Sequence, residues 1–393
     1  MLAKLERNIN ILYISGILGW ARFFLPVMAL FYISSEVTLI EFSIIMSIFS
    51  LVILLFEIPS GVFADLVGKK ISMICGVFCF VIEIFILTFF NGFEMFLLAK
   101  VISGFGVGFV SGASSAILYD SLKRLKRESE HKVISGKQFM YANISMAFVF
   151  IIGAYLFSID TKLPALVSLP FMVFQFILLF FLTEPYKSEH KTTFKNSFIH
   201  LKEGLSYFIS HKYVKFLIVY SLIISTFSNI LLTVSSLYYE AVLISITMIG
   251  VVAFFGSLVT AYANKVASKI EIVLGEKKSL IFIVFMMFIS LVFMTFLFPI
   301  FGFIPYFIFL FLFGFYNVVV NHYVNEHIET SHRATMLSIK NMFANVGMFL
   351  LFPVFGYFNQ NHDISVSLKF FIVLLVVYFI IVYLIFRKKK IFS

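Results

Sequence analysis

Long apolar runs, separated by short polar breaks, extend along the whole chain. The runs are continuous over about 20 residues and do not alternate with polar positions, which is the pattern of membrane-spanning α-helices. Helices are predicted at residues 10–33, 38–63, 71–91, 94–119, 137–158, 163–183, 213–238, 245–268, 278–298, 303–325, 335–358 and 365–386. The sequence therefore predicts an all-α membrane protein with twelve transmembrane helices.

The composition supports the same fold class. Hydrophobic residues make up 61% of the chain and charged residues 13%, against roughly 45–50% and 25% in soluble domains. The first apolar run is too long for the apolar core of a signal peptide and contains Arg22, so we expect it to remain as the first helix.

The basic residues are distributed unevenly between the two sets of polar breaks. Of the 30 Lys and Arg residues, 26 fall in breaks on one side of the predicted membrane, and only Lys162 and Lys369 fall on the other. Because basic loops remain in the cytoplasm, both termini and the central segment are predicted there. This topology accounts for the net charge of +10 without any nucleic-acid partner.

A polar central segment divides the chain into an N-terminal six-helix bundle (1–183), a linker (184–212) and a C-terminal six-helix bundle (213–393). Within the linker, apolar residues recur at helical spacing with lysines between them; they are Phe194, Phe198, Leu201, Leu205 and Phe208. This pattern predicts an amphipathic helix along the cytoplasmic membrane surface. It serves either as a tether or as a regulatory or partner-binding element.

The two halves also repeat each other. A Tyr-Ala-Asn triplet ends at Asn143 and a Phe-Ala-Asn triplet ends at Asn345, 202 residues later. Gly68-Lys-Lys is echoed by Gly275-Glu-Lys-Lys. With six helices in each half, equivalent segments have the same orientation, so the sequence predicts two pseudo-symmetric six-helix bundles.

The break between the second and third helices carries the most specific pattern. It reads Gly61-x-x-x-Asp65-x-x-Gly68-Lys69-Lys70, and it resembles the signature of the major facilitator superfamily at this position. The resemblance implies the major facilitator fold and transport by alternating access.

Two further stretches refine this resemblance. Lys100-Val-Ile-Ser-Gly104-Phe-Gly106 is similar to the motif of the family's fourth helix, whereas residues 150–155 lack the proline typical of many proton-coupled exporters. Glu57-Ile-Pro-Ser-Gly61 and Tyr119-Asp-Ser-Leu122 resemble a bacterial branch of drug and natural-product exporters, including self-immunity pumps for peptide antibiotics. That likeness implies an efflux antiporter in a bacterial inner membrane, conferring antibiotic resistance, and we expect a monomer.

The family pattern also implies a role for the signature residues. Asp65 is predicted at the partially negative C-terminal end of its helix, where a carboxylate is unfavourable by roughly 0.3–1 kcal/mol unless a positive group is near. The eleventh helix would present its N-terminus at the same face, with Arg333 just before it. The resemblance implies a latch between the halves at the cytoplasmic side; alternatively, the signature residues only fix topology.

Four charged residues fall within predicted spans of the N-terminal half, namely Arg22, Glu57, Glu83 and Lys100. Each costs several kcal/mol in the membrane unless it is paired or hydrated. Glu83 is expected to pair with Arg22 or Lys100. The pair is either a static salt bridge or a site that takes up and releases protons; Glu57 is the second candidate for proton coupling.

The C-terminal half offers polar candidates without charge. These are Asn229, Asn317, Asn321 and Asn345, and Gln175 joins them from the first half. Such groups either cross-link helices or line a substrate cavity. An uncharged, aromatic-rich half suits an amphipathic organic or peptide-like solute.

Together these features predict a proton-coupled exporter, with an importer or metabolite carrier of the same fold as the first alternative. A sensor or lipid-moving scaffold with a transporter fold is the alternative from another class. No cluster of acids, histidines or nucleophiles converges at one membrane depth, so neither an enzyme, nor a metal site, nor a cofactor is expected.

Overall fold

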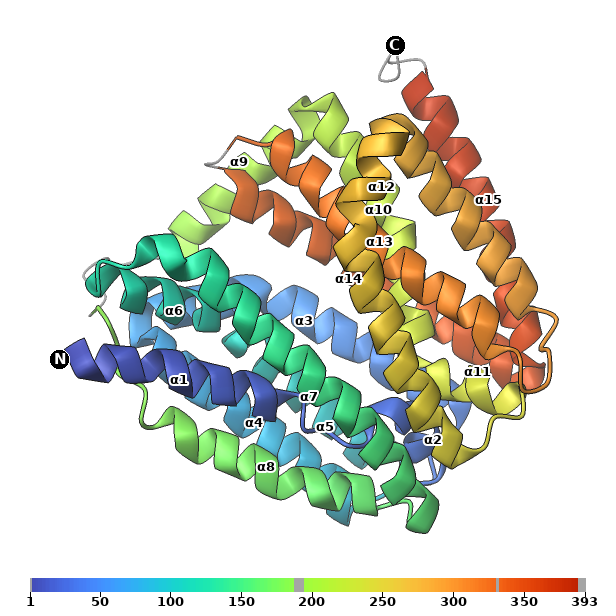
Figure 1. Cartoon of the computed structure of the whole chain (residues 1–393), viewed down its shortest axis with the longest axis horizontal. Coiled ribbons are helices and arrows are strands. Elements are labelled where there is room, and N and C mark those ends of the chain that lie inside the picture. The colour runs from blue at the N-terminus through green and yellow to red at the C-terminus, as the bar shows by residue number, and fades with distance from the viewer. Residues whose placement is uncertain (1, 187–193, 330–331, 388–393) are drawn as a thin grey trace. The chain divides into compact units, whose positions relative to one another are not determined.

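The computed structural model describes residues 2–186, 194–329 and 332–387 (Figure 1). Its regular secondary structure is helical. Within this described part, nine helices are long and apolar enough to cross a membrane. The chain is therefore a multi-pass, all-helical membrane protein.

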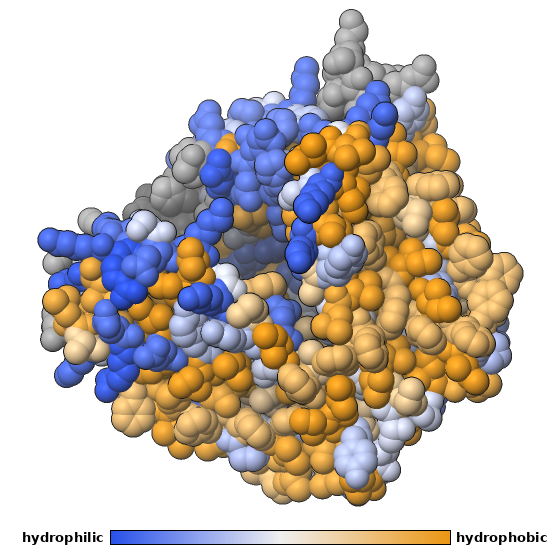
Figure 2. Space-filling view, viewed as in Figure 1, coloured by the Kyte–Doolittle hydropathy of each residue, from blue (hydrophilic) through white to orange (hydrophobic). Residues whose placement is uncertain are grey.

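The first of two compact units comprises Met1–Val37 and Ile48–Phe198. Its helices are α1 (Leu2–Gly19), η1 (Leu25–Val27), α2 (Met28–Ile33), α3 (Leu39–Val67), α4 (Lys69–Phe89), α5 (Phe93–Val110), α6 (Ala113–Arg124), η2 (Glu128–Glu130), α7 (His131–Ile159) and α8 (Leu163–Leu179). Helix α4 packs against α5 and α8, and α1 packs against α6, α7 and α8. Hydrophilic residues of this unit gather at the end that carries the N-terminus and α6 (Figure 2).

The second unit comprises Thr38–Ser47 and Ile199–Ser393. Its helices are α9 (Phe194–Ser210), α10 (Lys212–Thr233), α11 (Ser235–Ala241), α12 (Ile246–Met294), α13 (Phe303–Glu326), α14 (Arg333–Asn361) and α15 (Ile364–Arg387). Helix α12 packs along α13, and α10 packs against α14 and α15. All of the first ten residues of this unit except Thr38 belong to α3, where Ser47 Oγ donates a hydrogen bond of 2.6 Å to the carbonyl oxygen of Phe349.

The first predicted helix is broken, so the prediction of one continuous helix over 10–33 is wrong. Helix α1 ends at Gly19, and the chain resumes as η1 and α2 only after Phe24. Pro26 has no N–H to continue a helix. The freed backbone is satisfied elsewhere, because the N–H of Phe23 donates to Ser168 Oγ at 2.8 Å. Gly153 of α7 lies directly against the Phe23 carbonyl, where a Cβ would overlap it.

Glycines with positive φ account for two further differences. The predicted fourth helix is divided into α5 and α6 at Gly112, whose φ is 75°. The predicted break between the eighth and ninth helices is a kink within α12 at a single non-helical residue, Gly275 (φ 72°, ψ 167°). Glycine adopts such φ values without strain, so Gly112 divides a helix that was predicted to be continuous, and Gly275 replaces a predicted loop by a kink.

The predicted amphipathic segment is helical in the structure as α9. Its C-terminal part packs against α14: the Phe208 and Phe343 rings lie 5.5 Å apart, and a Cβ at Gly204 would overlap Thr335. Residues 187–193 of the predicted linker, and the side chains of Phe194, Phe198 and Leu201, lie outside the described residues.

Candidate functional site

Four polar side chains meet inside the first unit; we name them the Glu83 cluster. The Glu83 carboxylate is fully buried. It accepts hydrogen bonds from Lys100 Nζ at 2.6 Å and from Ser103 Oγ at 2.7 Å. Arg22 Nη1 lies 3.5 Å from the same carboxylate. One anion thus lies between two cations within segments that are predicted to span the membrane.

The local backbone explains how Arg22 reaches this cluster. Arg22 lies in the non-helical stretch after α1, whereas Glu83 belongs to α4 and Lys100 and Ser103 to α5. Its guanidinium group lies over the ring of Phe80, 4.1 Å from the ring centroid. Its buried Nε atom makes no hydrogen bond to any described residue. The break after α1 therefore places a second cation beside the Glu83–Lys100 ion pair, and the Nε–H group of this cation can donate a further hydrogen bond.

The sequence left open whether Glu83 would pair with Arg22 or with Lys100, and the structure brings it to both. The other predicted acid, Glu57, is half-buried on α3. Its carbonyl oxygen accepts a hydrogen bond of 2.9 Å from Ser60 Oγ. A role for Glu83 or Glu57 in proton coupling stays a prediction.

The signature glycine and lysines form a capped helix start between α3 and α4. Gly68 has a φ of 108°, so α3 and α4 are joined by one residue. The Glu184 carboxylate accepts hydrogen bonds from the backbone N–H groups of Lys69 (3.2 Å) and Lys70 (2.8 Å). A carboxylate at this position satisfies free N–H groups and complements the helix dipole. The sequence analysis missed Glu184, which is 115 residues from Lys69.

The lysine side chains fix this hinge to other helices. Lys69 Nζ forms an ion pair with Asp120 of α6 at 2.5 Å, and Lys70 Nζ donates to the carbonyl oxygen of Phe180 at 2.7 Å. Asp65 is exposed near the end of α3. In the second unit, Arg333 is exposed, and its Nε donates to the carbonyl oxygen of Asn325 at 3.0 Å.

A buried cation in the second unit corrects the expectation that this half carries no charge within its spans. Lys340 is only 8% exposed and lies on α14, inside the apolar segment Thr335–Asn361. Its Nζ donates to Asn321 Oδ1 at 2.5 Å and lies 5.7 Å from the Tyr316 ring centroid. The sequence prediction had placed it near the cytoplasmic start of the helix 335–358 and counted it with the basic residues of that side.

The polar contacts continue from Lys340 to α10. The hydroxyl groups of Tyr316 and Ser225 are hydrogen-bonded at 2.6 Å, and Asn229 Nδ2 donates to the Ser225 carbonyl oxygen at 2.8 Å. We name Ser225, Asn229, Tyr316, Asn321 and Lys340 the Lys340 cluster. Two hydrogen-bonded groups, Lys340–Asn321 and Tyr316–Ser225–Asn229, thus meet at the ring of Tyr316 across α10, α13 and α14.

The remaining predicted cavity residues have different surroundings. Gln175 is buried in the first unit, where its Nε2 donates to the Ser15 carbonyl oxygen at 2.9 Å and to Ser15 Oγ at 3.0 Å. This contact joins α8 to α1. Asn317 and Asn345 are half-buried in the second unit. Contact with a substrate stays a prediction for all of them.

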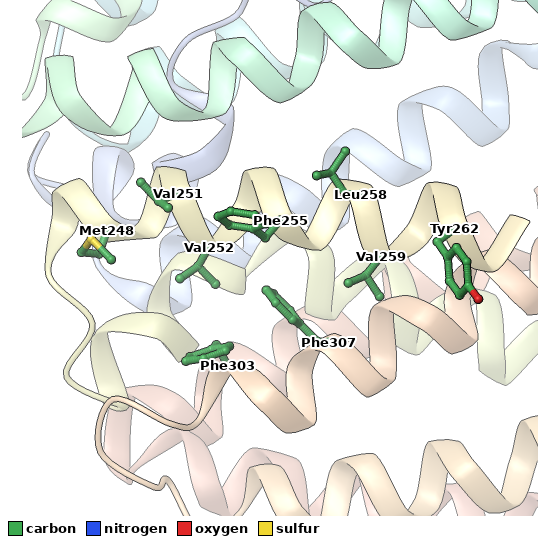
Figure 3. Close-up of a pocket in the computed structure, with 9 residues that line it drawn as sticks. All are labelled: Met248, Val251, Val252, Phe255, Leu258, Val259, Tyr262, Phe303 and Phe307. Atoms are coloured by element: carbon green, nitrogen blue, oxygen red, sulfur yellow. The ribbon is translucent and has the colours of Figure 1, made fainter.

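An apolar groove of about 520 Å³ lies between the first part of α12 and α13 (Figure 3). It is lined by Met248, Val251, Val252, Phe255, Leu258, Val259, Tyr262, Phe303 and Phe307. Figure 3 shows Phe303 and Phe307 on α13 facing the row of α12 side chains. None of these lining side chains is charged, so this α12–α13 groove is suited only to apolar groups.

Comparison with known proteins shows the family. The sequence model of the Major Facilitator Superfamily matches residues 11–350. The chain belongs to this superfamily. Membership of this family indicates a transporter, not an enzyme.

The individual relatives are more distant. An uncharacterized MFS-type transporter of Methanocaldococcus jannaschii is 28% identical over 120 residues, which cover 30% of this chain and 31% of that protein. The matched stretch thus spans less than a third of that relative's length.

Two solved transporters share the fold. The nucleoside transporter NupG has a TM-score of 0.77 at 13% identity, covering 98% of this chain and 99% of that one. The POT family transporter PepTSo has a TM-score of 0.74 at 10% identity, covering 100% and 99%. At these identities the likeness concerns the fold alone.

Proposed function

We propose that this superfamily member is a proton-coupled secondary transporter that works by alternating access and exports an amphipathic drug-like or antibiotic molecule. The observation that supports coupling is the Glu83 cluster, a fully buried carboxylate held by Lys100 and Arg22 at a break in a predicted membrane-spanning segment. Buried acids inside membrane proteins are by default candidates for proton pathways.

The chemistry of coupling follows from the charges of this cluster. When Glu83 is ionised, it neutralises Lys100 and attracts Arg22. When it takes up a proton, both cations lose their counter-charge and repel each other at short range. Since unpaired charges in this environment are costly, protonation favours a rearrangement that hydrates Arg22 or Lys100. Proton uptake is thereby tied to a change in conformation.

The helix lengths support twelve spans arranged as two six-helix bundles. Helix α12 has 49 residues, roughly 73 Å at 1.5 Å per residue, which is more than two membrane cores of about 30 Å; with its kink at Gly275 it supplies two spans. Helix α8 has 17 residues and supplies one more, and α1 with α2 another. The nine long helices in the described residues include α12 as a single helix. The second span of α12, the span of α8, and the span of α1 with α2 bring the total to twelve.

The basic loops support a cytoplasmic location for both termini. We further propose that Gly61, Asp65, Gly68, Lys69 and Lys70 form a latch with the start of α14 at Arg333 in the outward-facing state. The Glu184 cap and the Lys69–Asp120 ion pair fix this hinge as a rigid unit, which a latch requires.

The substrate class is inferred from the polar groups of the second unit and from the likeness to bacterial exporters. The Lys340 cluster offers hydroxyl, amide and ammonium groups among aromatic rings, which suits an amphipathic solute with a few polar groups. One of the similar solved proteins is named as a nucleoside transporter, so a nucleoside-like metabolite is the alternative cargo. We propose a monomer in a bacterial inner membrane.

Transport in vesicles tests this proposal. Cells that express the chain are challenged with diverse antibiotics, and a compound against which it protects is then followed in proteoliposomes with an imposed pH gradient. We expect the pH gradient to drive the compound across the bilayer, away from the cytoplasmic side of the transporter. Glu83→Gln should abolish the dependence of this movement on the gradient. Sensitisation of the cells would indicate import, and no gradient-driven movement of any solute would favour the sensor or scaffold.

The latch has its own test. Asp65→Asn should remove most transport while the protein still inserts and purifies as the wild type does. Glu94→Gln, an exposed acid in the first turn of α5, is the matched control and should leave transport unchanged. Normal transport by Asp65→Asn would refute the latch.

A further inference from the structure

A second apolar groove, of about 570 Å³, lies on the second unit between α10, the part of α12 after Gly275, and α15. Nothing in the proposed transport cycle uses it. Its lining includes Phe216 and Tyr220 of α10, Leu280 and Phe285 of α12, and Phe379 and Ile380 of α15. We name it the α12–α15 groove.

The floor of this groove is fixed by side-chain contacts. Tyr220 donates a hydrogen bond of 2.7 Å to the carbonyl oxygen of Leu280, and its ring lies 5.3 Å from that of Phe379. The hydroxyl of Tyr378 donates to the carbonyl oxygen of Val219. The floor is therefore preformed.

The rim, in contrast, is open to the surroundings. Phe285 is 58% exposed and Ile380 is 53% exposed. An open apolar groove on a membrane helix bundle faces acyl chains.

The charge of the groove is concentrated at one end. Lys277 lines that end, and Lys278 follows it on α12. The hydroxyl of Tyr213 donates to the Glu276 carboxylate, which brings the start of α10, with Lys212, to the same end. The three lysines outnumber Glu276 at this end, and basic residues beside a pocket between membrane helices attract anionic headgroups.

The length of the groove matches one leaflet of a bilayer. Its α12 lining extends from Lys277 to Phe288, a rise of eleven steps or about 16 Å at 1.5 Å per residue. Half of a hydrocarbon core of roughly 30 Å is about 15 Å. The lysine at one end matches an anionic headgroup, and the apolar surface beyond it matches an acyl chain that spans one leaflet. The groove therefore fits a lipid with an anionic headgroup.

We propose that the α12–α15 groove binds an anionic phospholipid of the surrounding bilayer, with its phosphate at Lys277 and an acyl chain along Phe285. The α12–α13 groove, of similar volume but without a charged lining residue, has no such preference. Two grooves on one helix, one with a lysine and one without, allow the headgroup's contribution to be measured against an internal control.

The test uses a matched pair of phenylalanines on α12. Phe285 and Phe255 are 58% and 52% exposed and lie in the two grooves. Each is replaced in turn by photoreactive benzoylphenylalanine, and the full chain is reconstituted in bilayers of equal parts phosphatidylglycerol and phosphatidylcholine. After illumination, the lipid adducts are identified by mass spectrometry.

We expect phosphatidylglycerol adducts at position 285 to exceed phosphatidylcholine adducts by about five-fold, the preference that one lysine near the surface provides. Position 255 should give equal amounts. Lys277→Gln should bring the ratio at 285 close to one, whereas Lys269→Gln, an exposed lysine of α12 outside the groove, should leave it unchanged. Folding is checked by a monodisperse elution profile.

Three outcomes would overturn the proposal. They are equal adducts of both lipids at 285, a ratio that survives Lys277→Gln, and cross-linking of 285 to a second copy of the chain in place of lipid. None of these measurements depends on transport, so the lipid site and the proposed function succeed or fail separately.

Discussion

Replacement of Glu83 by glutamine removes the only acid in the Glu83 cluster and keeps its shape. Lys100 Nζ, at 2.6 Å, and Arg22 Nη1, at 3.5 Å, would then face a neutral amide. Loss of one partner of a buried ion pair costs about 3–5 kcal/mol. In a unit of this size each 1 kcal/mol lowers the melting temperature by about 2–4 °C, so we expect a decrease of roughly 6–20 °C.

The chain carries its own reporter for this measurement. Trp20 is its one tryptophan and lies in the break after α1, two residues before Arg22. Its fluorescence in purified protein is followed during heating for the wild type and for Glu83→Gln. Glu94→Gln is the control, because an exposed acid in the first turn of a helix contributes at most about 1 kcal/mol.

A second substitution separates charge from packing. If the cost comes from the uncompensated cations, Lys100→Met added to Glu83→Gln should restore part of the lost stability. The reasoning fails if Glu83→Gln melts within 2 °C of the wild type, or if the double variant melts below Glu83→Gln.

Three further predictions follow from the backbone and from one half-buried lysine. Gly153→Ala should destabilise the protein by about 1–3 kcal/mol or more, since the added Cβ would overlap the Phe23 carbonyl. The control is Gly136→Ala on the same helix, whose Cβ would meet no atom within 4 Å and which should be neutral or stabilising in thermal melts. Gly275→Ala forces a non-glycine residue to a φ of 72° and should cost about 1–3 kcal/mol in the same assay. Partial burial lowers the pKa of Lys162 to about 8, whereas an unperturbed lysine has a pKa of about 10.4. Between these two pH values the unfolded chain binds more protons than the folded protein, so the free energy of unfolding rises with pH. The melting temperature of Lys162→Met should therefore rise less over this window than that of the wild type.

The sequence predicted features that depend on neighbouring residues along the chain. Apolar runs identified the helices, and the pattern from Gly61 to Lys70 identified the superfamily. The partners of Glu83 were also predictable as a set, because few charged residues fall at the depth of a membrane and each needs a counter-charge.

The features that were missed depend on distant contacts. The break after α1 is satisfied by Ser168, 145 residues from Phe23, and hydropathy does not register a hydrogen bond of that kind. Lys340 was counted among the cytoplasmic basic residues because it lies near the start of the predicted helix 335–358, whereas the structure buries it and bonds it to Asn321 on α13. Glu184 was likewise treated as part of a linker, although it caps α4.

The division of α3 between the two units has a practical consequence for protein engineering. Residues 38–47 belong to the second unit, although the chain of that unit otherwise begins at Ile199. A gene cut at the central linker therefore gives two fragments, and the C-terminal one lacks the segment that supplies Ser47 to the Phe349 carbonyl. Split reporters or chimaeric halves of this protein should carry a copy of residues 38–47 with the C-terminal fragment.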